Sequence, residues 1–267
     1  MPPESGPERW KRVSQRALFD DVAELYDATR QSYPNKIVEV VVRTAELEPG
    51  SSVLEIGCGT GQLTRRLAGR GLDITAIDIG PAMVAGSRRN VADPKVAFQV
   101  SSFEDFQASQ AFDLIVSATA FHWVEPDLGL AKAAHLLRPS GWLALLTTGE
   151  RYDEPLRSAL RQLWVKYNPS QAKWAPGAPW AESLRDTQLF GAVVETTHEQ
   201  RLELPVPTVL GVECTRATYL SFTREARQGF AADLEALLGP APSVSLVQET
   251  HLAMARVSPN GLQLPPA

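Results

Sequence analysis

Residues 53–61 (Val-Leu-Glu-Ile-Gly-Cys-Gly-Thr-Gly) place a carboxylate, Glu55, directly before three glycines that stand at alternate positions. The glycines are Gly57, Gly59 and Gly61. An apolar run precedes them and a helical pattern follows, so the segment is typical of a strand that turns through glycines into a helix. Such a turn offers bare backbone N–H groups to a ligand, since no Cβ holds the ligand away. Glu55 would repel a phosphate, so we expect a ligand with a positive end.

Two further side chains have chemical potential. Asp78 ends the second predicted strand, where a carboxylate can accept hydrogen bonds from both hydroxyls of a ribose. It could also cap the next helix, because Gly80-Pro81 follow. His122 is the only one of the four histidines at the predicted site. It is either a general base near pH 7 or a residue that bonds locally and shapes the pocket while Trp123 packs.

Alternating strands and helices position these residues. We predict strands at 53–56, 73–77, 96–100, 112–117, 141–147, 193–204 and 245–257. We predict helices at 8–31, 35–46, 61–70, 81–89, 128–137, 153–166, 208–221 and 223–238. The pattern predicts an α/β fold: a Rossmann-like, doubly wound, seven-stranded and mostly parallel sheet with helices on both faces and a C-terminal lid lobe. Ligands of such sheets bind at the carboxyl ends of the strands, where the glycine turn and Asp78 fall.

Composition narrows the possible partners. The chain has 267 residues, 44% apolar content and a net charge of −5, with scattered Lys and Arg, so we expect no nucleic-acid partner. No stretch approaches the roughly 20 apolar residues of a membrane span, and no secretory h-region opens the chain. The two cysteines, Cys58 and Cys214, form no framework, which favours a cytoplasmic location. No metal-ligand spacing occurs, so we expect no metal.

The order of the motifs indicates a family. Gln62 occupies the last glycine position of a dinucleotide fingerprint, whereas E-x-G-x-G-x-G resembles the first motif of class I S-adenosylmethionine (SAM)-dependent methyltransferases. Residues 117–124 (Ser-Ala-Thr-Ala-Phe-His-Trp-Val) resemble a motif of the small-molecule, trans-aconitate methyltransferase-like group. Residues 26–34 resemble its Y-x-x-x-R-x-x-Y-P element. The resemblance covers residues from about 19 to 149.

The resemblance implies roles for individual residues. Ala118 would lie beside the sulfonium, and Arg30 and Tyr33 would form part of a lid that reaches the methionine carboxylate. Ser102 stands where the family commonly has an adenine-binding Asp, and the Phe103 ring could lie against the adenine. The expected cofactor-binding residues are Arg30, Tyr33, Glu55, Gly57, Gly59, Gly61, Asp78, Ile79, Met83, Ser102, Phe103 and Ala118.

The implied reaction is methyl transfer from SAM to an oxygen, nitrogen or carbon of a small molecule. A non-catalytic SAM-binding protein or partner subunit is an alternative that would suit the same residues. An NAD-linked oxidoreductase is disfavoured by Gln62 and Glu55. Trp164, Trp174 and Trp180 favour either an aromatic substrate or a hydrophobic cover over the core.

The expected organisation has four parts. We predict a flexible tail at 1–18, a SAM-binding core with N-terminal lid helices at 19–150, and a substrate-covering lobe with the last two strands at 151–258. A Pro-rich tail at 259–267 follows. The sequence leaves the oligomeric state open.

Overall fold

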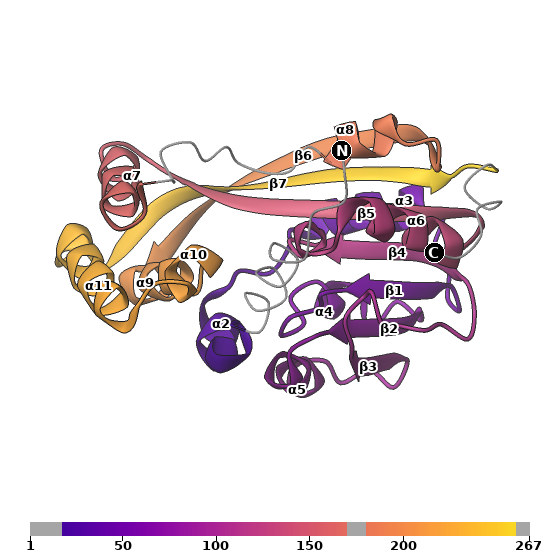
Figure 1. The fold of residues 1–267 in the computed structure, drawn as a ribbon, viewed down its shortest axis with the longest axis horizontal. Helices are drawn as coiled ribbons and strands as arrows, with labels where there is room; N and C mark the ends of the chain where they lie inside the picture. The colour runs from indigo at the N-terminus through magenta and orange to yellow at the C-terminus, as the bar shows by residue number, and fades with distance from the viewer. Residues whose placement is uncertain (1–17, 170–179, 260–267) are drawn as a thin grey trace.

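A seven-stranded sheet forms the centre of the computed structural model, which describes residues 18–169 and 180–259 (Figure 1). The strands are β1 (Ser52–Ile56), β2 (Asp73–Asp78), β3 (Val96–Val100), β4 (Phe112–Ala118), β5 (Leu137–Tyr152), β6 (Phe190–Pro205) and β7 (Ser243–Val257). Their order is β3-β2-β1-β4-β5-β7-β6. The first five strands are parallel, and β7 pairs antiparallel with β5 and β6. The Rossmann-like, mostly parallel sheet is therefore confirmed, with one antiparallel hairpin at its edge.

Helices cover both faces of this sheet. They are η1 (Asp20–Val22), α2 (Ala23–Thr29), α3 (Asn35–Thr44), α4 (Thr64–Leu67), α5 (Pro81–Asn90), η2 (Phe121–Trp123), α6 (Pro126–Leu136), α7 (Leu156–Tyr167), α8 (Trp180–Asp186), α9 (Val206–Cys214), α10 (Ala217–Leu220) and α11 (Arg224–Leu238). Successive strand residues point to opposite faces. Val53 and Leu114 pack with α3 and α4, whereas Leu54 and Ile115 pack with α6 and α8.

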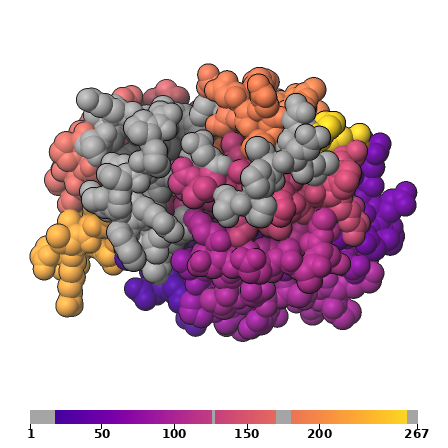
Figure 2. Space-filling view, turned by 45° about the vertical axis from the view of Figure 1, so that its right-hand side comes forward, coloured from indigo at the N-terminus to yellow at the C-terminus, as the bar shows by residue number. Residues whose placement is uncertain are grey.

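The last three strands of the sheet extend beyond the others and carry a helical lobe (Figure 1). β5 and β7 stay paired from Trp142 and Arg256 to Tyr152 and Leu246. A separate apolar cluster centred on the fully buried Phe230 joins α7, α9 and α11 to these strand ends. Figure 2 shows α7 and α11 on one side of the molecule and the magenta core elements on the other.

Several elements differ in length from the predictions. The helix expected at 61–70 is only the single turn of α4, because most of the segment before it forms the glycine bend. β5 continues to Tyr152, well past the predicted end at 147, because β7 pairs with it throughout. The helix expected at 208–221 is divided into α9 and α10 by the extended backbone of Arg216. The expected helix at 8–31 falls partly outside the described residues, and its described part forms η1 and α2.

The predicted tails, 1–18 and 259–267, lie outside the described residues except for Leu18 and Pro259. Within 18–169 and 180–259, none of the helices has the length and apolar content needed to cross a bilayer.

Candidate active site

The glycine bend after β1 has the left-handed backbone that its sequence predicts. Gly57 has φ 71° and Gly59 has φ 55°, values that residues with a Cβ seldom adopt. A Cβ on Gly57 would also collide with the side chain of Ala120. At Gly59 the nearest atom to such a Cβ would be 3.6 Å away, so there is space for a side chain. The left-handed backbone angle is therefore the main reason for a glycine at this position.

Asp78 braces this bend from the neighbouring strand. Its Oδ2 accepts a hydrogen bond from the Gly59 N–H and its Oδ1 one from the Gly80 N–H, both at 2.9 Å. Burial raises the pKa of Asp78, and the two N–H groups oppose that rise. Each carboxylate oxygen keeps a second lone pair that can accept a hydrogen bond from a ligand. Both predicted roles of Asp78, local cap and ligand acceptor, are therefore compatible.

Glu55 is the least satisfied group of the site. Its residue is 1% exposed, and its Oε2 has no hydrogen-bond partner among the described residues. Burial raises the pKa of Glu55 to about 8, despite the opposing effect of Thr64. Buried polar groups are nearly always paired, so this carboxyl marks a position for a ligand that is cationic or donates hydrogen bonds.

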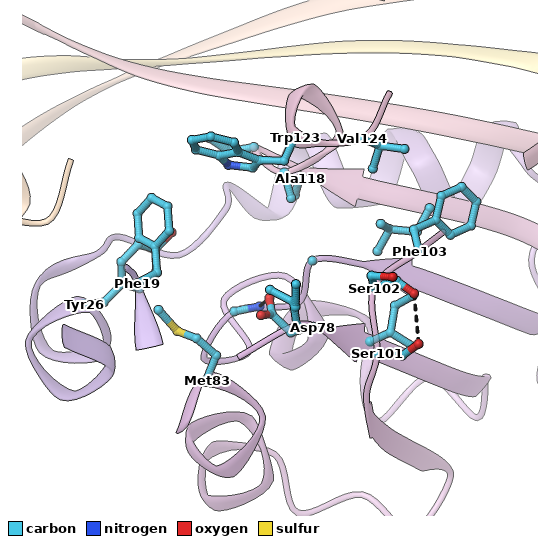
Figure 3. Close-up of a pocket in the computed structure, with 17 residues that line it drawn as sticks. Phe19, Tyr26, Asp78, Met83, Ser101, Ser102, Phe103, Ala118, Trp123 and Val124 are labelled. Carbon is cyan, nitrogen blue, oxygen red and sulfur yellow. Dashed lines mark hydrogen bonds between the residues drawn. The ribbon is translucent and has the colours of Figure 1, made fainter. Parts of the chain in front are cut away.

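Two cavities meet at the bend. The first extends over Asp78 towards the end of β3 and is lined by the residues labelled in Figure 3. Phe19, Tyr26 and Met83 stand on one side of it, and Trp123 lies over it, as the close-up shows. The second cavity contains Glu55. Residues that line both cavities are Tyr26, Gly57, Gly59, Ala118 and Thr119. The arrangement suits one elongated ligand lying across the bend.

Comparison with known proteins agrees with this geometry. Residues 53–141 match the methyltransferase domain family. Trans-aconitate 2-methyltransferase of Mycolicibacterium gilvum is 31% identical over 210 residues, which cover 71% of this chain and 78% of that protein. The chain belongs to the class I SAM-dependent methyltransferases. An uncharacterized methyltransferase of Mycobacterium tuberculosis is 33% identical over 129 residues, 48% of this chain, and the match spans about half of that relative's length (51%).

A solved structure of a protein assigned as a type II methyltransferase, from Anaeromyxobacter dehalogenans, shares the fold of this methyltransferase-family chain. It superposes with a TM-score of 0.60 at 24% identity, covering 85% of this chain and 97% of that one. The family assignment made from the motifs is confirmed by the domain match and the Mycolicibacterium gilvum relative, and this solved structure supports the fold.

Most of the predicted cofactor residues come together at the two cavities. Asp78, Ile79, Met83, Ser102 and Phe103 line the first cavity. Arg30, Tyr33 and Glu55 line the second, and Gly57, Gly59 and Ala118 line both. Gly61 lines neither of them. Its φ is 93°, and a Cβ there would press on Ser87 and Val91 of the α5 segment, so the glycine serves backbone geometry and helix packing.

The two residues predicted to meet an adenine differ in their environments. Phe103 is buried in the apolar cluster beneath the cavity, with the Lys132 ammonium 5.4 Å from its ring centroid. The Ser102 hydroxyl donates to Asp105 Oδ2 at 2.7 Å and accepts from the Asp105 N–H. Its one remaining lone pair is all that this hydroxyl offers to a ligand amino group.

The predicted lid residues connect the core with the lobe. Arg30 follows α2 and donates to Thr215 Oγ1 at 3.3 Å and to the Val212 carbonyl at 3.2 Å, both near the end of α9. Tyr33 donates to Thr119 Oγ1 at 3.0 Å. Burial raises the pKa of Tyr33 above its ordinary value, so its hydroxyl keeps its proton at neutral pH. The Arg30 guanidinium retains further N–H donors for a ligand carboxylate.

His122 lies in η2, between Ala120 and Trp123, which both line the first cavity. Its side chain is exposed, its ring centroid is 4.9 Å from that of Trp123, and it lines neither of the two cavities. Trp123 itself does line the first cavity. This placement favours the alternative in which His122 supports the pocket wall, and it does not favour the general-base role.

Sequence reasoning missed several lining residues. Thr119 has φ 55°, a left-handed backbone that is uncommon outside glycine, and such strain is frequent at functional sites. Gln62 was read only as a departure from a glycine fingerprint, yet it lines the second cavity. Thr148, Glu150 and Gln248 come from the extended strands and had no motif to reveal them.

Trp164 and Trp180, the two of the three lobe tryptophans that the structure describes, do not support an aromatic substrate. Trp164 packs on Phe230 at 4.4 Å between ring centroids and donates to Glu213, inside the lobe. Trp180 is buried against Phe121 in the core. Both fit the hydrophobic-cover alternative, and Trp174 lies outside the described residues.

Proposed function

We propose that this protein transfers the methyl group of SAM to a small-molecule acceptor and releases S-adenosylhomocysteine. The unpartnered, buried Glu55 Oε2 beside the glycine bend is the observation that carries the proposal. SAM has an ammonium group at its methionine end, which would supply the missing hydrogen bonds and the positive charge. A dinucleotide phosphate would meet repulsion from the same carboxylate.

The residues present fit this cofactor along its length. Asp78 would hold the ribose hydroxyls, while Met83, Ser102 and Phe103 would surround the adenine. Glu55 would bind the ammonium of the methionine part, and Arg30 would bind its carboxylate. Each of these two groups would thus meet a side chain of opposite charge. Between the adenosine part and the methionine part, Gly57 and Gly59 would let the cofactor lie close to the protein backbone, because neither residue has a Cβ.

When bound, SAM supplies a methyl group already activated by its sulfonium. The chain's task is then to orient an acceptor and to exclude water. Tyr33 and Thr119, which share a hydrogen bond where the two cavities meet, would fix one wall of the acceptor position. Phe19 and Trp123, whose rings are 6.0 Å apart, would cover the other side. An amine acceptor needs only to arrive unprotonated, whereas a phenol or acid acceptor must also give its proton to a base as the bond to the methyl group forms.

The organisation and location follow from the same assignment. We propose that residues 19–150 form the cofactor-binding core and that 151–258 form the substrate-covering lobe. A cytoplasmic location and the absence of a nucleic-acid partner remain proposals based on the free cysteines and the net charge of −5. The relative from Mycolicibacterium gilvum is named for trans-aconitate, which makes that compound one acceptor to test here.

Calorimetry tests the cofactor and a labelled-methyl assay tests the reaction. We expect SAM and S-adenosylhomocysteine to bind and NADH not to bind; NADH binding without SAM binding would reject the proposal. With SAM bound, transfer of labelled methyl to any member of a small-molecule panel separates an enzyme from a non-catalytic SAM-binding protein or partner subunit. SAM binding with no transfer across the panel would favour that alternative.

A further inference from the structure

A row of polar side chains crosses the extended strands at one end of the second cavity. Glu150 of β5 lies opposite Gln248 of β7, which in turn lies opposite Gln200 of β6. The next pair along is Thr148 and Thr250, whose hydroxyls are 3.2 Å apart. We call these five residues the polar row. Residues two apart on a strand share a face, so the row lies on one face of the sheet.

The polar row is largely buried and borders the proposed cofactor site. Gln248 is 2% exposed, Thr250 is fully buried, and the Glu150 side chain is 9% exposed. Thr148, Glu150 and Gln248 line the same cavity as Glu55 and the glycine bend. The members of the row pair with one another or with Arg216, and their carboxylate, amide and hydroxyl groups keep further lone pairs and N–H donors that a ligand can use.

The charges behind the row are arranged to leave a carboxylate facing the cavity. Arg216 donates to Glu150 Oε2 at 2.9 Å, but it is also held by both oxygens of Glu213 at 2.8 and 2.9 Å. Glu213 is completely buried and accepts further hydrogen bonds from Tyr152 and Trp164. One guanidinium is therefore shared between two carboxylates, and the group as a whole carries one net negative charge.

Arg216 cannot turn to serve an anionic ligand without leaving Glu213 as an uncompensated buried charge. Arg30, the arginine that lines this cavity, is the residue assigned above to the methionine carboxylate. A carboxylate ligand on the polar row would therefore meet Glu150, whereas an ammonium group would gain a charge-assisted hydrogen bond from it.

We infer that the methyl acceptor binds on the polar row and carries an amino group that Glu150 recognises, rather than a carboxylate. This inference rests on the proposed function, because it gives Glu55 and Arg30 to the cofactor and takes the remaining part of the second cavity, along the polar row, as the acceptor position. Gln248 and Thr148 are positioned to accept or donate the remaining hydrogen bonds of such a molecule.

Matched pairs of probes test the charge preference on protein saturated with S-adenosylhomocysteine. We compare phenethylamine with 3-phenylpropionate, and butylamine with valerate, by saturation-transfer NMR on that protein, and separately by labelled methyl transfer on protein supplied with SAM alone. We expect the amines to bind about tenfold more tightly than the carboxylates, as for a charge-assisted hydrogen bond. A preference for carboxylates, or the absence of amine binding, would overturn the inference.

Substitutions in the polar row test which residue causes the preference for amines over carboxylates. Glu150→Gln and Gln248→Leu should each weaken amine binding, and Glu150→Gln should abolish the discrimination between the members of each pair. Glu249→Gln is the control, because Glu249 neighbours Gln248 on the opposite face of β7 and bonds to Arg151. If the preference persists in Glu150→Gln, the assignment to Glu150 is wrong. Binding of S-adenosylhomocysteine, measured separately by calorimetry, reports on the proposed function alone.

Discussion

Glu55 is the residue at which folding and ligand binding place opposite demands. A buried carboxyl with one oxygen unpartnered among the described residues destabilises the fold when it is charged, and burial accordingly raises its pKa to about 8. The same carboxyl, once ionised, would attract the ammonium of SAM. A destabilised side chain at a binding site is a common outcome of selection for function.

The free energy of unfolding should therefore depend on Glu55. Since the folded-state pKa lies above the ordinary 4.5, this group's contribution is fully present below pH 4.5 and is lost as the pH rises towards about 8. The slope in that window is up to about 1.4 kcal/mol per pH unit. We expect Glu55→Gln to remove the slope, to raise the stability of the cofactor-free protein near pH 8, and to weaken SAM binding. Chemical denaturation at several pH values and calorimetry measure these effects.

The exposed Glu48 supplies the control, as Glu48→Gln should change neither quantity. A Glu55→Gln protein that is no more stable near pH 8 and binds SAM normally would contradict the role assigned to the carboxyl.

Asp78 should contribute mainly to cofactor affinity. We expect Asp78→Ala to weaken binding of S-adenosylhomocysteine by at least about tenfold, the scale of a lost charge-assisted hydrogen bond (about 1.5–3 kcal/mol). Calorimetry measures the affinity. Asp73→Ala, an exposed carboxylate at the other end of β2, is the matched control. Equal affinities of the two variants would remove the ribose role from Asp78.

Substitution of His122 distinguishes its two possible roles, support of the pocket wall and general-base catalysis. Because its side chain is exposed outside both cavities, we expect His122→Ala to keep turnover within about threefold of the unmodified protein. Steady-state rates with the identified acceptor measure this. A loss of a hundredfold or more would instead be typical of a missing general base.

At the scale of elements, the N-terminal segment is the piece that joins the core to the lobe. α2 lies between α5 and α9 (Figure 1). Asp27 of α2 accepts a hydrogen bond from Asn90 at the end of α5, and Gly211 of α9 packs directly on Thr29. Phe19 and Tyr26 of this segment line the first cavity. We therefore expect its position to decide how well the proposed cofactor site is covered.

Asp20 ties this segment to the start of α5. Its Oδ1 accepts from the N–H groups of Ala82 at 2.7 Å and Met83 at 3.1 Å, so it caps a helix that has no side-chain cap of its own. We expect Asp20→Ala to lower the free energy of unfolding by about 1 kcal/mol and to weaken SAM binding. Thermal denaturation and calorimetry measure the two effects. The exposed neighbour, Asp21→Ala, should leave both unchanged; an equal loss in both variants would show that the cap is unimportant.

At the scale of the whole molecule, one sheet runs through both the core and the helical lobe. Its five parallel strands hold the cofactor side, and the extended parts of β5, β6 and β7 hold the helical lobe. The Glu213–Arg216–Glu150 group lies at their junction and connects α9 to β5. Burial by itself would raise the pKa of Glu213, but Arg216 and the hydrogen bonds hold that pKa below its ordinary value. Glu213 thus stabilises the fold above the ordinary carboxyl pKa and loses this contribution on acidification.

Arg216→Leu would leave Glu213 charged, buried and unpaired. We expect a loss of about 3 kcal/mol in the free energy of unfolding, the scale of breaking one side of a buried ion pair. Chemical denaturation at neutral pH measures it. Arg151→Leu breaks the exposed pair with Glu249 and should cost no more than about 1 kcal/mol. Equal costs of the two variants would mean that the junction adds nothing to stability.

The sequence by itself determined the family and the sheet, and it predicted the cofactor end of the proposed site. The signals are local, because each depends on residues that are close in the sequence. Apolar residues repeat with a period of two in strands and 3.6 in helices, and the glycine run directly follows Glu55. These signals were sufficient to predict all seven strands, although the end of β5 was placed too early. Gly61 shows the limit of such a motif, because its partner Val91 lies 30 residues away along the chain.

Only the tertiary structure decided what stands beyond the cofactor. Glu150, Gln248 and Gln200 lie in three separate strands and become neighbours through β-pairing, which no local pattern encodes. The position of His122 after β4 predicts a place at the site. In the structure, however, the turn of η2 leaves its side chain exposed outside both cavities. Side-chain direction and long-range pairing depend on the whole packed chain, and these two features set the charge that an acceptor would meet.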